Sequence, residues 1–90
     1  MSSLARKQSE ELEYRGVALS FTEDSLCLQL SDGREIRVPL EFYPKLKKAS
    51  KSQRENFEII GLGTGIHWPE LDEDLSVRGI VLGYPSIDSP

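Results

Sequence analysis

The sequence predicts an α+β domain: an antiparallel β-meander of three strands plus two short later strands, packed with two or three short helices. Three observations lead to this fold class. Apolar and polar residues alternate through residues 16–38, turn-forming residues interrupt this alternation twice, and helical patterns follow residue 43. Strands joined by tight turns form a meander, and its apolar face needs a cover that the later elements supply.

The three strands of the meander are separated by two predicted turns. The first strand places Val17, Leu19 and Phe21 on one face. Residues 23–24 predict the turn into a second strand, in which leucines again occupy every other position. Residues 32–33 are Asp-Gly, the strongest short hairpin signal, because glycine tolerates a positive φ. A third alternating strand follows this hairpin turn.

Two short helices are predicted after the meander. Pro39 ends the third strand, because proline has no amide hydrogen to donate to a sheet, and Pro44 fits the first turn of a helix. Ser50 and Gln53 have the spacing of a capping box. A second helix is therefore expected over about residues 51–56.

Two short strands and a last helix are predicted in the final third of the chain. Phe57, Ile59 and Leu62 mark one strand, and residues 66–68 mark the other. Glycines spaced by two predict a bulge or tight turn where the backbone passes closely: Gly61, Gly63 and Gly65. Residues 76–82 predict the last helix, which a glycine ends.

One domain is predicted over residues 16–84, between a flexible or partly helical arm (residues 1–15) and a tail (residues 85–90). Ninety residues fit one small domain. No apolar run approaches the roughly 18–20 residues of a membrane span, and the arm lacks the apolar stretch of a signal peptide. The single cysteine, Cys27, cannot form an internal disulfide. We therefore expect a cytoplasmic protein with no membrane contact.

Charge is divided between a basic and an acidic segment. The net charge of −4 argues against non-specific binding of nucleic acid, which requires neutralisation of phosphates. The basic segment, residues 45–54, holds five cations: Lys45, Lys47, Lys48, Lys51 and Arg54. It predicts either a solvated helix face or the binding of an acidic protein partner or second copy, with phosphate contacts as an alternative.

Residues 65–75 hold the richest set of chemical groups in the chain. They include the only histidine and the only tryptophan, and they define a candidate functional surface: His67, Trp68, Glu70, Asp72, Glu73 and Asp74. A structural interpretation is favoured. Trp68 then fills the core or its rim, and His67 on the opposite face forms a hydrogen bond with a neighbouring carboxylate. Asp72 and Asp74 would satisfy free amide groups at the start of the last helix.

Chemical roles for His67 are the alternatives. An imidazole with carboxylates suits Zn²⁺, Mn²⁺ or Fe²⁺, or general acid–base catalysis. However, one histidine supplies at most one nitrogen ligand, and no signature of a nucleophile or oxyanion site accompanies it. The acids at residues 70–74 lack the spacing of an EF-hand loop. We therefore predict no catalytic residue, no metal and no cofactor.

The order of these pieces resembles DUF2442, a family of small bacterial domains of unknown function. The matching stretches are residues 28–40, Tyr43-Pro44-x-Leu46 with Ala49-Ser50, Gln53-Arg54-x-Asn56 and the closing run of residues 63–77. The resemblance covers roughly residues 16–83 and implies a compact α+β unit. It also implies that some similar domains precede a helix-turn-helix domain, which residues 84–90 do not fit. Others are encoded beside small proteins in arrangements that look like toxin–antitoxin pairs.

These observations favour a non-enzymatic protein-interaction or regulatory module. The resemblance implies a narrower form, the antitoxin-like half of a toxin–antitoxin pair. A protein partner is expected, and a homodimer is compatible with the sequence. The alternatives are a small metal-binding protein or enzyme with its site around His67 and the acids at residues 70–74, and nucleic-acid binding through residues 45–54.

Overall fold

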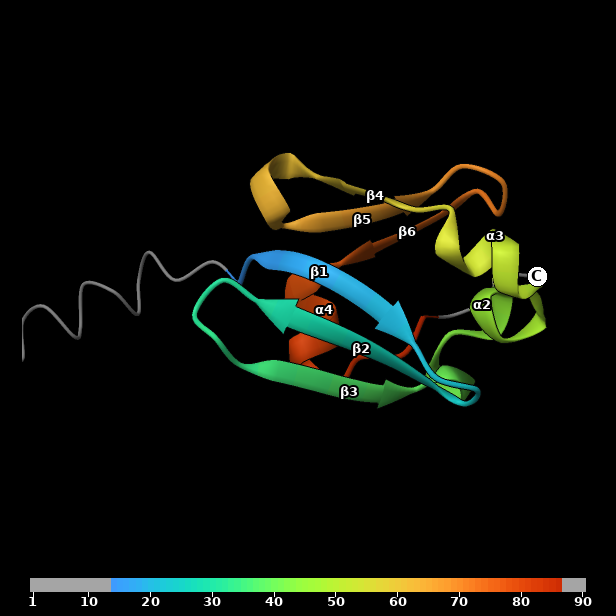
Figure 1. Cartoon of the computed structure of the whole chain (residues 1–90), viewed down its shortest axis with the longest axis horizontal. Helices are drawn as coiled ribbons and strands as arrows, with labels where there is room; N and C mark the ends of the chain where they lie inside the picture. The colour runs from blue at the N-terminus through green and yellow to red at the C-terminus, as the bar shows by residue number, and fades with distance from the viewer. Residues whose placement is uncertain (1–13, 87–90) are drawn as a thin grey trace, which may run out of the picture.

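The structure, a computed structural model, describes residues 14–86 and contains two three-stranded antiparallel sheets with order β1-β2-β3 and β4-β5-β6 (Figure 1). Its elements are β1 (Gly16–Phe21), β2 (Ser25–Leu30), β3 (Glu35–Pro39), η1 (Leu40–Phe42), α2 (Pro44–Lys48), α3 (Lys51–Glu55), β4 (Glu58–Ile60), η2 (Gly61–Gly63), β5 (Gly65–Trp68), β6 (Glu73–Ser76) and α4 (Val77–Leu82). The predicted α+β class and the three-stranded meander are confirmed. Most of the predicted N-terminal arm and the end of the tail lie outside the described residues.

The first strand departs from the predicted alternation at Val17. Gly16 pairs with Leu30 and Ala18 pairs with Gln29, so β1 carries one extra residue at this point. A bulge of this kind turns the extra residue out of the alternating pattern. Val17 is consequently 59% exposed, while Leu19 and Phe21 pack against the core as expected. The predicted common face for all three residues was therefore wrong at Val17.

The turns and caps agree with their local sequence. Gly33 adopts a φ of 98°, and Asp32 accepts hydrogen bonds from the backbone and side chain of Arg34. These contacts lower the pKa of the Asp32 carboxyl, with the backbone hydrogen bond as the main cause. Both hydrogen bonds of the predicted capping box form between Ser50 and Gln53 at the start of α3.

The second sheet contains three strands, whereas the sequence predicted two. The additional strand is β6, in which Leu75 is the only apolar residue, so its own sequence gives little indication of a strand. It forms because it pairs with β5 along its whole length. β4 ends at Ile60, and Leu62 lies in the η2 turn instead of the predicted strand.

Helix α4 begins after β6, with a cap that the sequence did not identify. The side chain of Ser76 accepts a hydrogen bond from the amide of Gly79, and Gly83 ends the helix in the left-handed conformation. Asp72 lies before β6 and Asp74 within it, so the predicted capping role of both carboxylates was wrong. The longest helix of residues 14–86 is α4 with six residues, and none found there has the length and apolarity to cross a membrane.

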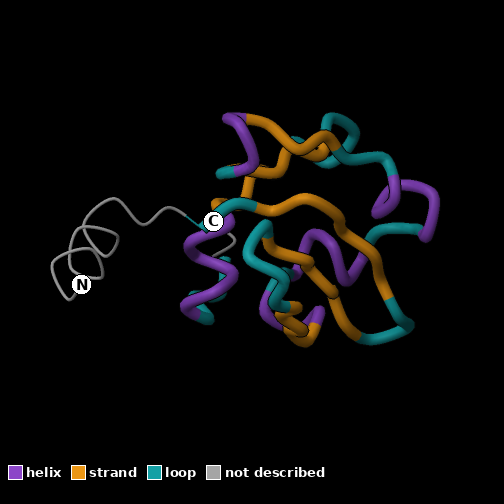
Figure 2. Tube along the Cα trace, turned by 60° about the vertical axis from the view of Figure 1, so that its left-hand side comes forward, coloured by secondary structure: helices purple, strands orange, loops and turns teal. Residues whose placement is uncertain are grey.

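Both sheets, the linker between them and α4 contribute to one hydrophobic core. The strands, orange in Figure 2, are joined by loops and short helices. Strand residues make up the larger part of the buried core cluster within the described range. The largest fully buried side chains are Trp68 and Tyr43. Around them lie Leu26, Leu28, Leu40, Leu46, Ile66, Val77 and Ile80. Because the inner faces are used for packing, the outer face of β4-β5-β6 remains available for function.

Candidate functional site

His67 lies on the outer face of the second sheet, in the middle of strand β5. Its neighbours Ile66 and Trp68 are completely buried, and His67 points the other way because side chains alternate along a strand. The register places His67 opposite Glu58 of β4 and opposite Asp74 of β6. The outer face therefore carries a row of one imidazole between two carboxylates.

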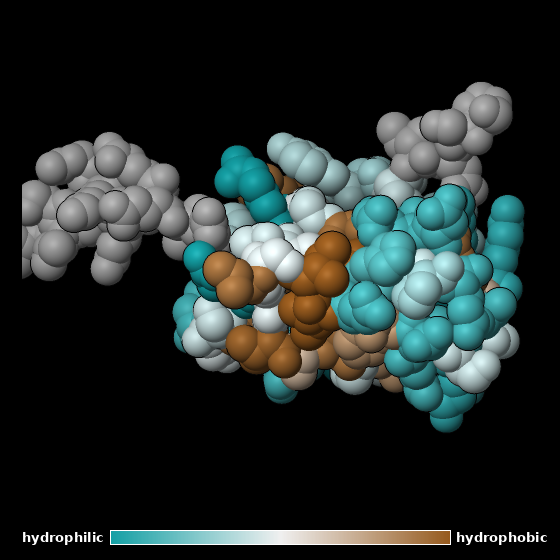
Figure 3. Space-filling model, turned by 90° about the horizontal axis from the view of Figure 1, so that it is seen from above, coloured by the Kyte–Doolittle hydropathy of each residue, from teal (hydrophilic) through white to brown (hydrophobic). Residues whose placement is uncertain are grey.

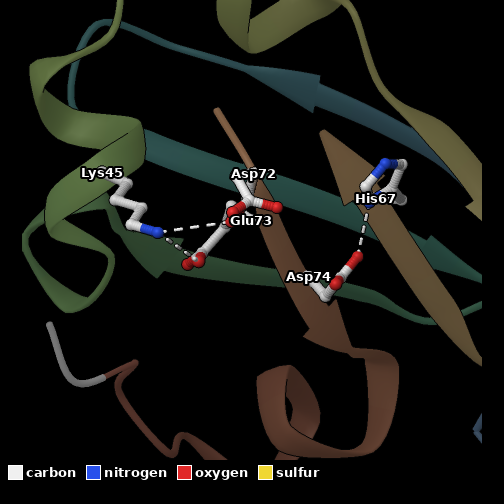
Figure 4. A network of polar contacts seen from close by, with 5 residues as sticks. All are labelled: Lys45, His67, Asp72, Glu73 and Asp74. Atoms are coloured by element: carbon white, nitrogen blue, oxygen red, sulfur yellow. Dashed lines mark hydrogen bonds and ion pairs between the residues drawn. The ribbon is translucent and has the colours of Figure 1, made fainter. Parts of the chain in front are cut away.

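The imidazole is fixed by the carboxylate of Asp74. The His67 Nδ1 and Asp74 Oδ1 atoms are 2.5 Å apart, and Figure 4 shows the two side chains pointing toward one another from adjacent strands. An ionised carboxylate only accepts hydrogen bonds, so Nδ1 carries the hydrogen and donates it. The other ring nitrogen, Nε2, is then left for a further partner. The predicted hydrogen bond between His67 and a carboxylate is confirmed.

The remaining acids of residues 70–74 lie apart from this pair. Glu70 accepts a hydrogen bond of 3.0 Å from the Asn56 side chain. Glu73 is mostly buried and lies 3.9 Å from the Lys45 ammonium group, which also donates to the backbone oxygen of Asp72 (Figure 4). No group of three or more His, Cys, Asp or Glu side chains suited to a metal ion occurs within residues 14–86.

Trp68 belongs to the core, as the structural interpretation of the sequence predicted, although it was also named in the candidate functional surface. Its side chain is completely buried, and its ring lies 6.2 Å from that of Phe57. The indole Nε1 donates a hydrogen bond of 2.8 Å to the carbonyl oxygen of Arg54. A ligand on the outer face would not contact Trp68 directly.

Some cations of the basic segment make contacts within the chain, and others are exposed to solvent. Lys47 lies 3.5 Å from a carboxylate oxygen of Glu41. The Arg54 guanidinium donates to the carbonyl oxygens of Leu46 and Lys47, at 2.8 and 3.1 Å. Lys48 and Lys51 are exposed. The five cations therefore do not present a single continuous basic surface.

The structure adds an apolar corner that the sequence reasoning missed, formed by Val17, Ile60 and Leu62. These side chains are 59%, 43% and 84% exposed. The start of β1 lies against η2, as a hydrogen bond from Arg15 Nη1 to the carbonyl oxygen of Leu62 shows. Figure 3, which views the molecule from the side of β4 and β5, shows apolar surface gathered at the end where η2 lies. The glycines on either side of Leu62 were the available signal.

A cavity lies away from His67, between the β1–β2 turn and α3. It has a volume of about 490 Å³ and is lined by Phe21, Thr22, Glu23, Lys51, Arg54 and Glu55. Its lining mixes two cations with two acids. His67 is not among these residues.

The fold and this face define a small two-sheet α+β domain that presents a histidine–carboxylate pair beside exposed apolar residues. The family model described as "Protein of unknown function (DUF2442)" matches residues 17–86, so the chain belongs to the DUF2442 family. The resemblance stated from the sequence is thereby confirmed. A search of the curated proteins gives no match.

Two solved structures have the same fold. A crystal structure of a protein of unknown function from Rhodospirillum rubrum is 29% identical, with a TM-score of 0.73, and the match covers 84% of this chain and 94% of that one. A solution NMR structure of an uncharacterised protein from Chromobacterium violaceum is 22% identical, with a TM-score of 0.70, and the match covers 96% and 80% of the two chains. The second likeness concerns the fold alone.

Proposed function

We propose that this chain is a non-enzymatic protein-interaction module that binds its partner on the outer face of β4-β5-β6. The observation that carries the proposal is a fixed hydrogen-bonded pair, His67 with Asp74, on the same sheet face as the exposed Ile60, with the exposed Leu62 in the turn that follows β4. Mixed polar and apolar surface is typical of interfaces between proteins that also exist apart.

The position of His67 favours binding over catalysis. Catalysis by an imidazole requires a substrate held within hydrogen-bond reach, and enzymes usually provide this in a concave pocket. His67 lies instead on an open sheet face, and it is not among the residues that line the cavity between the β1–β2 turn and α3. On such a face the imidazole can supply an oriented hydrogen bond at an interface.

The distribution of charge favours a protein over a nucleic acid. Lys45, Lys47 and Arg54 make contacts within the chain. The outer face itself carries Glu58 and Asp74, and the net charge is −4. Phosphate groups would be repelled by this face, whereas a protein can match it.

A narrower form of the proposal is that the domain regulates one dedicated partner, as the antitoxin-like half of a pair. Its support is the family resemblance alone, and the geometry of the face bears on binding in general. A dedicated partner would form a complex of fixed stoichiometry with the domain. Capture of many proteins at low occupancy would contradict this narrower form.

The test is affinity capture with the tagged chain from nuclease-treated native lysate at low salt. The wild type and Glu35→Ala, a control on the exposed face of β3, should retain the same protein. His67→Ala should retain at least about tenfold less of it, because an interface contact worth about 1.4 kcal/mol is lost. The substitution should leave the fold intact, since the contact between His67 and Asp74 lies at the surface, where such a contact contributes only about 0–1 kcal/mol. Capture of no protein by the wild type would refute the proposed function.

A further inference from the structure

Leu62 occupies a backbone conformation that disfavours leucine. Its φ of 58° and ψ of 35° are left-handed, and it lies between Gly61 and Gly63, whose φ values are 61° and 93°. Side chains with a β-carbon crowd the backbone in this region, and Gly, Asn and Asp are the residues that adopt it most readily. A leucine at the centre of three successive left-handed residues therefore needs a reason.

Hydrogen bonds from Thr64 and Arg15 stabilise the turn. Thr64 donates both its amide and its hydroxyl hydrogen to the carbonyl oxygen of Gly61, at 3.1 and 2.7 Å. Arg15 Nη1 donates to the carbonyl oxygen of Leu62 at 2.9 Å. All these contacts involve the backbone of the turn, so Gly or Asn at position 62 would preserve them.

Packing does not explain the leucine either. Leu62 is 84% exposed, the highest value among the exposed large hydrophobic residues of the described range, 14–86. It therefore gains little from burial within the described chain, while the backbone is strained. Exposed apolar side chains held in fixed positions can serve as anchors that fill pockets on a partner.

Two other exposed apolar residues, Ile60 and Val17, lie on the segments that adjoin the turn of Leu62. Ile60 lies opposite Gly65 on the outer face of the sheet. Its side chain extends over Gly65, because a β-carbon added to Gly65 would lie 3.3 Å from Ile60 Cγ1. Val17 is turned outward by the bulge in β1. Leu62 thus lies two residues after the exposed Ile60, and the start of β1, which carries the exposed Val17, packs against the same turn.

The charges beside the corner indicate which kind of partner fits. Glu58 lies on the same strand as Ile60, and its side chain forms no hydrogen bond or ion pair with the rest of residues 14–86. Asp74 lies across the same row, and the chain has a net charge of −4. Two copies placed face to face would bring these carboxylates together, whereas a basic surface would complement them.

We infer that Leu62 is the anchor of the docking surface, and that it enters an apolar pocket rimmed by basic residues on a different protein. This inference rests on the proposed function and specifies its partner. It assigns Leu62 to binding at the expense of stability.

The decisive variant is Leu62→Asn, because asparagine suits the left-handed backbone but removes the apolar group. It should unfold at the same or a higher temperature than the wild type. Its affinity for the protein captured by the wild type, purified and measured by calorimetry, should fall at least about tenfold. Leu82→Asn is the matched control, since Leu82 is an exposed leucine on α4 outside the corner, and it should keep the affinity.

The basic rim has its own test. Glu58→Lys should weaken the same complex at least about tenfold, and Glu35→Lys on β3 should not. The wild-type affinity should also fall as salt is added, because opposite charges are screened. An affinity unchanged by Glu58→Lys would refute the basic rim.

Three results separate the possible failures. If the wild type captures no protein, the proposed function fails and this inference fails with it. If the wild type and Leu62→Asn capture the same protein equally well, or Leu62→Asn is markedly less stable, only the anchor role is refuted. A wild-type dimer by light scattering that Leu62→Asn converts to a monomer would replace the basic partner with a second copy.

Discussion

The indole Nε1 of Trp68 donates a 2.8 Å hydrogen bond to the carbonyl oxygen of Arg54, whose guanidinium donates in turn to the carbonyl oxygens of Leu46 and Lys47. This one arginine joins β5, α3 and α2. The two carbonyls that it satisfies lie near the end of α2, where a helix lacks internal donors for its last carbonyl groups. Two residues suspected of function thus form a structural connection.

Arg54→Ala should lower the free energy of unfolding by about 1.5–3 kcal/mol, because two carbonyls lose a charged donor. Lys48→Ala, which removes an exposed cation from the same basic segment, should change it by less than about 0.5 kcal/mol. Urea denaturation followed by the fluorescence of Trp68 measures both values. Equal midpoints for the two variants would show that the connection carries no stability.

Trp68→Phe should destabilise the domain by about 1–3 kcal/mol. The smaller ring leaves a cavity in the core, and the carbonyl oxygen of Arg54 loses its indole donor. Circular dichroism during urea denaturation is the appropriate measurement, because the variant has no tryptophan. An unchanged midpoint would contradict the structural role assigned to this residue.

Gly63→Ala should destabilise the domain more than Gly33→Ala. Both glycines have φ values above 90°, so backbone strain should lower the free energy of unfolding of both alanine variants by a similar amount, about 1–2 kcal/mol. A β-carbon at position 63 would also lie 3.0 Å from the carbonyl oxygen of Gly16, whereas one at position 33 would meet nothing within 4 Å. We expect an additional loss of about 1 kcal/mol or more in Gly63→Ala. Thermal unfolding of the pair gives this difference directly, and equal losses would argue against a close approach of η2 to β1.

Tyr43→Phe should leave stability unchanged or raise it by up to about 1 kcal/mol at neutral pH. The Tyr43 side chain is completely buried, and its hydroxyl has no hydrogen-bond partner within residues 14–86. Removing a buried polar group without a partner costs little. A marked loss of stability would instead indicate a partner for the hydroxyl, such as a bound water.

The same substitution should change the response to alkaline pH. Burial raises the pKa of Tyr43 to about 12 from its ordinary value of 10.0. The folded state therefore keeps a proton that the unfolded state releases, and this contribution to stability is complete below pH 10 and lost as pH rises toward 12. Between these values the wild type should lose stability faster than Tyr43→Phe. Parallel pH profiles for the two proteins would exclude this linkage.

The features that the sequence determined are those that depend on a few adjacent residues. The turn at residues 32–33 follows from glycine's tolerance of a positive φ, and the capping box of Ser50 and Gln53 follows from their spacing. The alternating leucines of β2 supplied the core of the meander. In the same way the sequence indicated that His67 would meet a carboxylate, because several surround it.

The tertiary structure decided everything that depends on pairing between distant segments. β6 exists because β5 pairs with it, and that register selects Asp74 as the partner of His67 and places Glu58 opposite. A bulge set by the pairing of β1 with β2 turns Val17 outward, and the passage of η2 against β1 fixes Leu62 in a left-handed conformation. Such contacts join residues far apart in the chain, so local patterns do not encode them. The apolar corner and its place beside the histidine therefore emerge only when both sheets are assembled.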